Sequence, residues 1–373
     1  MAVTDVQAAV AAVAQKTAGA ITRRNLSIQG MRGVAALFVL LFHASVYSGR
    51  HFGESGWATA FDGRFGLVGV AVFFTISGLL MSDLIQRSDP WRFLAHRIVR
   101  IYPLYLLAVA GLLLLIATHL AEGKLSSHIF SLMLVPAGQR PYYLGVEWTL
   151  VFECTYYLAL FLIALVGWRR YLNRIALFWL LMIAASSYFF WSNDDDVLYR
   201  NYSIWFSAAN VAFIGGLLIP RLSRTPIPVG TGIVALSVLL AVTIPGNITT
   251  HRWIAGIVAT LFVLDVVRIQ IPDRALLGLP KLGDWSYALY LCHVPCILII
   301  FYWWPSSSAI GMAWFTAIAT SLVVAAALGM LDVRMYRKLK NAVDSAEPHR
   351  RQRLVNIYAA AFVVASLIAL VIH

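Results

Sequence analysis

The sequence predicts an all-α protein, a polytopic membrane helix bundle of about 11 transmembrane helices with a cytoplasmic N-terminus and the C-terminus outside. Three observations lead to this prediction. Of the 373 residues 60% are hydrophobic and only 12% are charged, with a mean hydropathy of +0.77, which excludes an ordinary soluble domain. Long apolar stretches recur along the whole chain. Lys and Arg are distributed unevenly among the segments that join these stretches.

A helix needs about 20 residues to cross a bilayer core. Eleven apolar stretches are close to this length, although some of them are a few residues shorter. They are residues 31–48, 66–86, 99–118, 148–167, 174–191, 204–220, 229–245, 253–268, 284–302, 310–331 and 354–372. A further apolar run near 128–136 is too short to cross, and we expect it to be re-entrant or interfacial.

The basic residues indicate the orientation. With the N-terminus in the cytoplasm, 22 of the 29 Lys and Arg residues fall in inside segments and six fall outside, while Arg32 lies within a span. The acidic run Asp194–Asp196 falls outside, where a solvated loop is the expected interpretation. This is the distribution that the positive-inside rule predicts. It explains the net charge of +12, so we expect no nucleic-acid partner.

The expected organisation has three parts: a cytoplasmic N-terminal arm at 1–24, a membrane domain at 25–340, and a basic cytoplasmic loop with the final span at 341–373. The arm is Ala-rich, and Asp5 precedes any Lys or Arg, so it is unlike a signal peptide. All three cysteines lie within predicted spans, so no disulfide framework is expected.

The first span carries two ionisable residues, Arg32 and His43, which are eleven residues apart. Eleven residues turn an α-helix to within about 20° of three full turns and advance it by about 16 Å. One helix face therefore presents a cation at the cytoplasmic border and an imidazole near the middle of the bilayer. Such groups are costly without a partner or a water-filled cavity, so we expect a functional site. The alternative is a snorkelling arginine and a hydrogen-bonded core histidine.

The second span is rich in small residues, with Gly66, Gly69, Ser77 and Gly78. Small residues allow another helix to approach closely within a membrane. We expect these positions to serve helix packing and assign them no chemistry.

Two arginines, Arg97 and Arg100, are three residues apart at the cytoplasmic entry to the third span and so share a helix face. Paired guanidinium groups suit a phosphate, because each offers a planar fork of donors. Basic residues at this border are also expected for topology alone. The spacing leaves both interpretations open.

The fourth span contains GVEWTLVFECTYY, which places Glu153 six residues deeper than Glu147. Trp148 belongs to the aromatic belt expected at the outer interface. A buried Glu153 needs a partner, which Tyr156, Tyr157 or an imidazole on another helix can supply. A structural hydrogen bond and a general base look alike at this level.

The ninth span contains a polar ridge, because Tyr287, Tyr290 and His293 follow at intervals of three residues and share a helix face. His293 again lies near the middle of the bilayer. Cys292 points about 100° away from it, and we expect this cysteine to be a small packing residue.

Together these segments resemble the acyltransferase-3 family, integral-membrane enzymes that O-acylate bacterial surface polysaccharides and some antibiotics. The resemblance covers about residues 25 to 340 and rests on five ordered motifs. In chain order they are SIQGMRGVAALFVLLFH with the family's Arg, ten residues, His; GVAVFFTISG; RIVRIYPLY with its Arg-x-x-Arg; GVEWTLVFECTYY with Thr149 for the usual Ser; and LGDWSYALYLCH.

The sequence departs from the family pattern at two places. Gln29 stands where the family usually has Asp. LDVRMYRKL, with Asp332 and Arg334, replaces the usual Glu-x-Pro after the tenth helix. These departures weaken a role for that terminal carboxylate but leave the arginine–histidine pair of the first span intact.

The resemblance implies a multi-pass protein of the bacterial cytoplasmic (inner) membrane. Such an enzyme transfers an acyl group, most simply acetyl, from cytoplasmic acyl-CoA to a hydroxyl of an extracytoplasmic or lipid-linked carbohydrate. Acyl-CoA is then a co-substrate, and neither a permanently bound cofactor nor a metal is expected. The nucleotide phosphates are expected to contact Arg32, Arg97 and Arg100.

The expected catalytic centre is His43, either as a general base or as a nucleophile that carries the acyl group. Glu153 or His293 is expected to orient its ring and fix its tautomer. The candidates for substrate contact are Trp148, Tyr287 and Tyr290.

A proton-coupled transporter of a small solute is the alternative function, because many spans with a central His and Glu also suit proton movement. Transporters often contain paired repeats, and the sequence has no second copy of the Arg-ten-His pattern. The enzyme is therefore favoured. A purely structural scaffold would not need so many ionisable groups in its spans.

Overall fold

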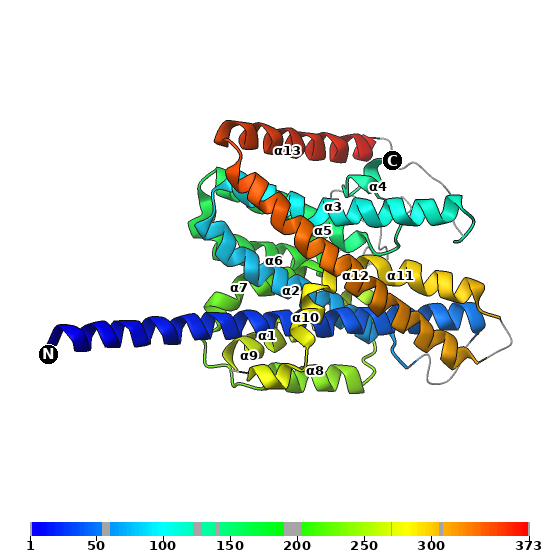
Figure 1. The fold of residues 1–373 in the computed structure, drawn as a ribbon, viewed down its shortest axis with the longest axis horizontal. Coiled ribbons are helices and arrows are strands. Elements are labelled where there is room, and N and C mark those ends of the chain that lie inside the picture. Colours follow the sequence, from blue (N-terminus) through cyan, green and yellow to red (C-terminus); the bar gives the residue numbers. More distant parts are fainter. Residues whose placement is uncertain are drawn as a thin grey trace.

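The computed structural model describes residues 2–53, 60–121, 129–138, 142–189, 203–269, 271–305 and 309–371, with the side chains of the first helix given from Leu26 onward. Within these ranges the secondary structure is helical, and no β-strand forms (Figure 1). The predicted all-α class is confirmed.

Nine of the described helices are long and apolar enough to cross a membrane. They are α1 (Ala2–Phe52), α2 (Gly63–Arg87), α3 (Pro90–Ala117), α5 (Trp148–Leu165), α6 (Leu172–Phe189), α9 (Ile248–Arg268), α11 (Ser286–Trp303), α12 (Ile310–Ser345) and α13 (Pro348–Val371). The short run predicted not to cross contains only the four-residue helix α4 (Ile129–Leu132).

Two of the eleven predicted spans are shorter than expected: α7 (Asn210–Leu222) and α8 (Thr231–Ala241) have 13 and 11 residues. Before α7 the chain forms a separate 3₁₀ helix, Ser203–Phe206. After α8 the backbone is already extended at Val242. The following Pro245 disfavours helix in the residue before it, so the apolar composition of 229–245 overstates the helix.

The last turn of α9 fixes the connection between these two short helices. The buried carboxylate of Asp265 accepts the backbone N–H groups of Gly232 and Ile233 at 2.7 and 3.1 Å, at the start of α8. The guanidinium group of Arg268 donates to three backbone carbonyls at and beyond the end of α7, those of Leu222, Thr225 and Ile227. An acid at a helix N-terminus and a base at a C-terminus both suit the helix dipole.

The predicted packing role of the glycines in α2 is confirmed. A Cβ atom at Gly78 would meet the carbonyl oxygen of Phe213 on α7, and one at Gly216 would meet that of Thr75 on α2. The two backbones therefore touch where these helices cross. On the other side of α2, Gly69 packs against α1.

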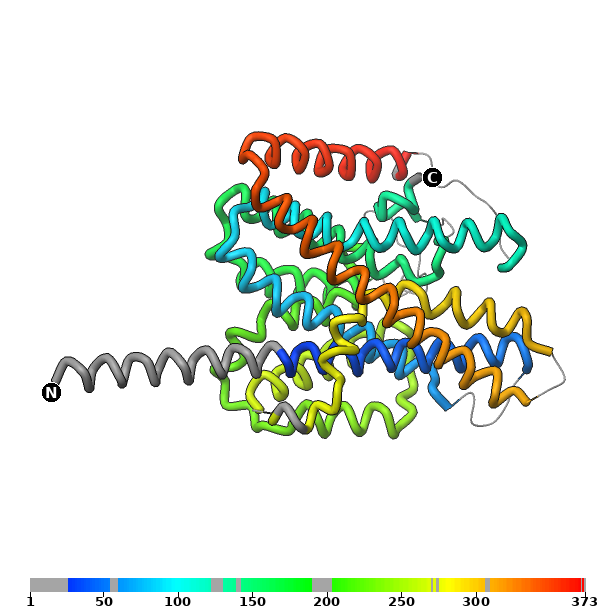
Figure 2. The backbone as a smooth tube through the Cα atoms, in the orientation of Figure 1, coloured from blue at the N-terminus to red at the C-terminus, as the bar shows by residue number. Residues whose placement is uncertain are grey.

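The helix α1 is the central element of the bundle, because it lies against α2, α11, α12 and the short helix α10 (Leu279–Asp284). In Figure 2 the trace of α1 runs through the molecule, while α13 forms one margin and packs against α3. The turns from α2 to α3 and from α12 to α13 lie at one end of the bundle, and α1 ends and α2 begins at the opposite end (Figure 1). This alternation agrees with the predicted loops; which end faces the cytoplasm stays a prediction.

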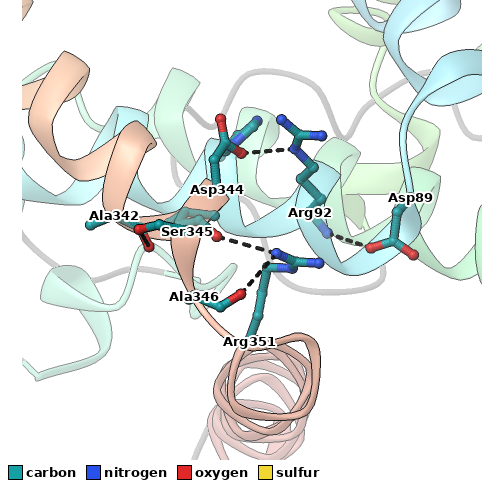
Figure 3. A network of polar contacts seen from close by, with 9 residues as sticks. Asp89, Arg92, Ala342, Asp344, Ser345, Ala346 and Arg351 are labelled. Carbon is teal, nitrogen blue, oxygen red and sulfur yellow. Dashed lines mark hydrogen bonds and ion pairs between the residues drawn. The ribbon is translucent and has the colours of Figure 1, made fainter.

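A polar network joins α3, α12 and α13 at that first end (Figure 3). Asp344 near the end of α12 accepts Nε of Arg92 at 2.8 Å and Nε2 of His96 at 2.7 Å, both from α3. Arg351 of α13 donates to the carbonyl oxygen of Val343 at 3.2 Å. The network attaches α13, which lies at the edge of the bundle, to α12.

Candidate active site

Two histidines from different helices meet inside the bundle, His43 of α1 and His293 of α11. Nδ1 of His43 lies 3.1 Å from Nε2 of His293, and the ring centroids are 4.9 Å apart. His293 is 1% exposed, whereas His43 is partly exposed. The structure therefore brings together the two mid-span histidines that the sequence separates by 250 residues.

The backbone contacts of the pair determine where the ring protons lie. Nδ1 of His293 is 2.9 Å from the carbonyl oxygen of Leu289, which can only accept, so this nitrogen carries a proton. In the neutral ring Nε2 of His293 is then an acceptor, and Nδ1 of His43 donates to it. The same Nδ1 faces the carbonyl oxygen of Val39 at 2.9 Å, which also requires a donor. Nε2 of His43 therefore keeps an unprotonated lone pair.

A cavity of about 130 Å³ lies between α1, α2, α3, α5 and α11. The residues of its lining that carry a full charge at neutral pH are three arginines and one glutamate: Arg32, Arg97, Arg100 and Glu153. Tyr290 also lines it, and its ring centroid is 5.9 Å from that of His293. Neither histidine lines the cavity directly. The Tyr290 ring therefore borders both the cavity and the imidazole pair.

The three arginines are not equivalent, because Arg100 already has a partner. Its Nη1 lies 2.5 Å from Oδ2 of Asp332 on α12, and the Asp332 side chain is only 2% exposed. The guanidinium group also lies over the rings of Tyr287 and Tyr336, at 5.1 and 5.3 Å. Arg100 therefore links α3 to α12, and the expected phosphate contact at this arginine stays a prediction.

Arg97 and Arg32 are the two cavity arginines that form no ion pair with a carboxylate in the described part of the chain. Arg97 lies 5.8 Å over the ring of Tyr157, and its buried Nε has no hydrogen-bond partner in the described part of the chain. Arg32 donates from Nη1 to the side-chain oxygen of Gln29 at 3.3 Å. Because Gln29 is neutral, this contact leaves the charge of Arg32 in place. An anionic ligand would find both groups available.

Glu153 belongs to the arginine cavity and does not orient the histidines. It accepts the hydroxyl of Tyr157 at 3.1 Å and interacts electrostatically with Arg32, Arg97 and Arg100. No hydrogen bond in the described part of the chain joins it to His43. Of the two predicted orienting partners, His293 is the one in contact.

The hydroxyls of the two candidate tyrosines are engaged within the fold. Tyr287 donates to the carbonyl oxygen of Ile101 at 2.8 Å. Tyr290 donates to that of Val146 at 2.6 Å and lies 2.5 Å from the hydroxyl of Thr149, which donates to it in turn. Both rings line the cavity and determine its shape, but their hydroxyls are not free to bind a ligand there.

Trp148 lies outside the cavity lining. Its ring packs edge-on against Phe74 and Phe152, with centroids 6.5 and 5.9 Å away. Its neighbour Glu147 is fully buried and accepts the backbone N–H groups of Leu144 and Val146. The start of α5 is thus held by structural contacts, and substrate contact at Trp148 stays a prediction.

Two residues of this region received no role from the sequence. Asp332 was noted only as a departure from the family pattern, because its partner Arg100 is 232 residues away. Ser286 was part of a quoted motif, and its position directly before the polar ridge of α11 was the available signal. The acidic run Asp194–Asp196 lies outside the described residues.

Comparisons with known proteins identify the family and its relatives. The acyltransferase-3 family model, described as an acyltransferase domain, matches residues 25–331. The exopolysaccharide production protein ExoZ of Rhizobium meliloti (strain 1021) is 30% identical over 285 residues, which cover 70% of this chain and 82% of that protein. The putative membrane-bound transacylase BcsY of Komagataeibacter xylinus is 26% identical over 75% of this chain and 74% of its own.

A shorter similarity, at 30% identity, joins 45% of this chain to half of nodulation protein 10 of Rhizobium leguminosarum bv. viciae. No solved structure matches the fold significantly.

Proposed function

Since the chain belongs to the acyltransferase-3 family, we propose that it transfers an acyl group, most simply acetyl, from acyl-CoA to a hydroxyl of a carbohydrate. The nine long apolar helices in the described part of the chain make it a multi-pass membrane protein. The names of ExoZ and BcsY refer to exopolysaccharide production and to transacylation, which supports a polysaccharide or its lipid-linked precursor as the acceptor. The bacterial cytoplasmic membrane is the proposed location.

The observation that carries this proposal is the hydrogen-bonded pair His43–His293 next to a cavity lined by arginines. Arg97 and Arg32 would bind phosphates of the donor nucleotide at one end. The acyl thioester would then reach the imidazole pair past the ring of Tyr290. The residues of α1 alone span about 16 Å from Arg32 to His43, a distance comparable to the reach of the donor's pantetheine arm.

The unprotonated Nε2 of His43 suits either of two routes. As a general base it takes the proton of the acceptor hydroxyl, whose oxygen attacks the thioester carbonyl. The carbon–sulfur bond then breaks, and the coenzyme A thiolate leaves with that proton. As a nucleophile, Nε2 would first form an acyl-histidine and release coenzyme A, before the hydroxyl takes the acyl group. Both routes use the same atom.

In either route His293 acts as a positioning residue. Its Nε2 accepts the proton of His43 Nδ1, which fixes the tautomer in which Nε2 of His43 is free. The same hydrogen bond strengthens when His43 gains positive charge during the reaction.

The proposal is tested with purified protein, radiolabelled acetyl-CoA and a cell-envelope fraction. Label should enter carbohydrate with the native protein and fall to background with His43→Ala. His349→Ala is a matched control, because His349 is an exposed histidine at the start of α13. Full transfer by a normally expressed His43→Ala protein would remove the centre of the proposal.

The competing function, a proton-coupled transporter, loses support from the family match, which makes the protein an acyltransferase. Proton-driven solute uptake without acyl turnover in the same preparation would restore it.

A further inference from the structure

The polar groups that line the cavity fall into two classes. The hydroxyls of Thr149, Tyr157, Tyr287 and Tyr290 donate to other groups of the protein, and Arg100 is paired with Asp332. The donors that remain unused in the described part of the chain belong to arginines and to two hydroxyls, those of Ser77 on α2 and Ser286 on α11. A ligand of the cavity must therefore match these unused groups.

Of these two hydroxyls the more deeply buried is that of Ser286, the first residue of α11. Ser77 is 8% exposed and lies in the middle of α2, where a carbonyl one turn earlier is within its own helix. The side chain of Ser286 is 0% exposed, it lines the cavity, and its Oγ has no hydrogen-bond partner in the described part of the chain. Buried polar atoms in folded proteins are nearly always paired, so such an atom calls for an explanation. Because Ser286 lies in the first turn of its helix, it lacks the carbonyl one turn earlier in the same helix to which buried helical serines commonly donate.

The position of Ser286 says what kind of group it can meet. It precedes His293 on the same helix by seven residues, about 10 Å along the axis. Gly283, three residues earlier in α10, packs on the backbone of Gln29 in α1, and Ser286 and Arg32 line the same cavity. Ser286 therefore lies between the arginines and the imidazole pair, along the route that the donor's arm would follow.

We propose that Ser286 binds an amide of the pantetheine arm of the acyl donor. A hydroxyl can donate to an amide carbonyl and accept from an amide N–H, and the arm carries amides between its phosphate end and its thioester. Arg97, with its own unpaired Nε, binds the phosphate end. This inference rests on the proposed function, because it takes acyl-CoA as the donor.

The experiment compares two probes, acetyl-CoA and acetyl-pantetheine, which has the same arm without phosphates or nucleotide. Dissociation constants are measured by titration of the purified, full-length protein in detergent. Ser286→Ala should weaken both probes by a similar factor, about threefold to tenfold, as expected for one neutral hydrogen bond. Arg97→Ala should weaken acetyl-CoA and leave acetyl-pantetheine unchanged.

Ser48→Ala is the matched control. Ser48 is also a 0% exposed serine whose Oγ has no partner in the described residues, but it does not line the cavity. It should bind both probes like the native protein. An affinity loss shared equally by Ser48→Ala and Ser286→Ala would overturn the inference, because the loss would then follow from a disturbed fold.

Different outcomes would contradict the proposed function and the proposed role of Ser286. If the native protein binds neither probe, acyl-CoA is the wrong donor and the proposed function fails. If the native protein binds acetyl-CoA but Ser286→Ala binds both probes equally well, the donor is right and the role of Ser286 is wrong.

Discussion

Nδ1 of His43 and Nε2 of His293 lie 3.1 Å apart, and this contact joins the first helix of the bundle to the eleventh. The carbonyl oxygens of Val39 and Leu289 fix the proton positions of both rings. In the proposed function His43 reacts through its unprotonated Nε2, and His293 holds the His43 ring in position. This pair is then the reactive end of the route, separated from the arginine cavity by the ring of Tyr290.

The first prediction concerns the different roles proposed for His43, which reacts, and His293, which positions it. His43→Ala should lower kcat by about 10² to 10⁴-fold, the usual contribution of a general acid–base group. His293→Ala should lower kcat by about 10²-fold and leave the donor KM unchanged, because it misplaces the ring without touching the donor site.

His293→Gln is the informative control, since its amide oxygen can accept the proton of His43 Nδ1. It should recover part of the lost kcat. Equal losses for the Ala and Gln variants would show that His293 does more than position the ring.

The second prediction separates the two arginines of α3. Arg97→Ala should raise the donor KM by about tenfold or more, the value of a hydrogen bond to a charged group, with little change in Tm. Arg100→Ala should instead lower Tm, by an amount that reflects about 3–5 kcal/mol, because it leaves the buried Asp332 carboxylate unpaired.

Removing both charges of the Arg100–Asp332 ion pair tests whether the unpaired carboxylate causes the loss of stability. Arg100→Met combined with Asp332→Leu should regain most of the lost Tm, since no unpaired charge remains. A double variant as unstable as Arg100→Ala alone would contradict the ion-pair explanation.

The third prediction concerns the crossing of α2 and α7. Gly78→Ala should lower Tm markedly, because its Cβ would strike the backbone of Phe213. Gly111→Ala in α3 is the matched control: nothing lies within 4 Å of its added Cβ, so it should leave Tm unchanged or raise it by the equivalent of about 0.5–1 kcal/mol. Similar Tm values for the two variants would mean that the helices do not touch there.

The fourth prediction concerns the last turn of α9. Asp265→Ala should cost about 1–3 kcal/mol, because it leaves the buried N–H groups of Gly232 and Ile233 without an acceptor. Asp83→Ala breaks only an exposed ion pair with Arg87 and should cost at most about 0.5 kcal/mol. Thermal unfolding of the two purified variants gives the comparison, and a smaller effect at Asp265 would contradict the capping role.

The sequence allowed the membrane class, most spans and the two histidines to be predicted, because hydropathy and the spacing from Arg32 to His43 are local signals. The pairing of Arg100 with Asp332 was out of reach, since it depends on how α3 and α12 meet in space. The lengths of α7 and α8 were overestimated because apolar composition does not reveal that residues 203–206 form a separate 3₁₀ helix or that the backbone becomes extended at Val242.

The position of Glu153 also shows that contacts between distant helices cannot be predicted from the sequence of one span. Its depth in a span suggested a partner for an imidazole, and that inference was reasonable from one helix alone. In the folded bundle its carboxylate faces the arginines, and His293 comes from another helix to meet His43. Depth along a span can be read from sequence, but the direction of a side chain around the bundle cannot.

We propose that the donor route crosses the membrane domain from the arginine cavity, where the phosphates would bind, to His43. Sealed inverted membrane vesicles, with labelled acetyl-CoA added outside and carbohydrate recovered from the lumen, provide the decisive assay. Label should enter lumenal carbohydrate with the native protein, and none should enter with His43→Ala at equal expression. Lumenal labelling that persists at the native rate in the His43→Ala vesicles would contradict it.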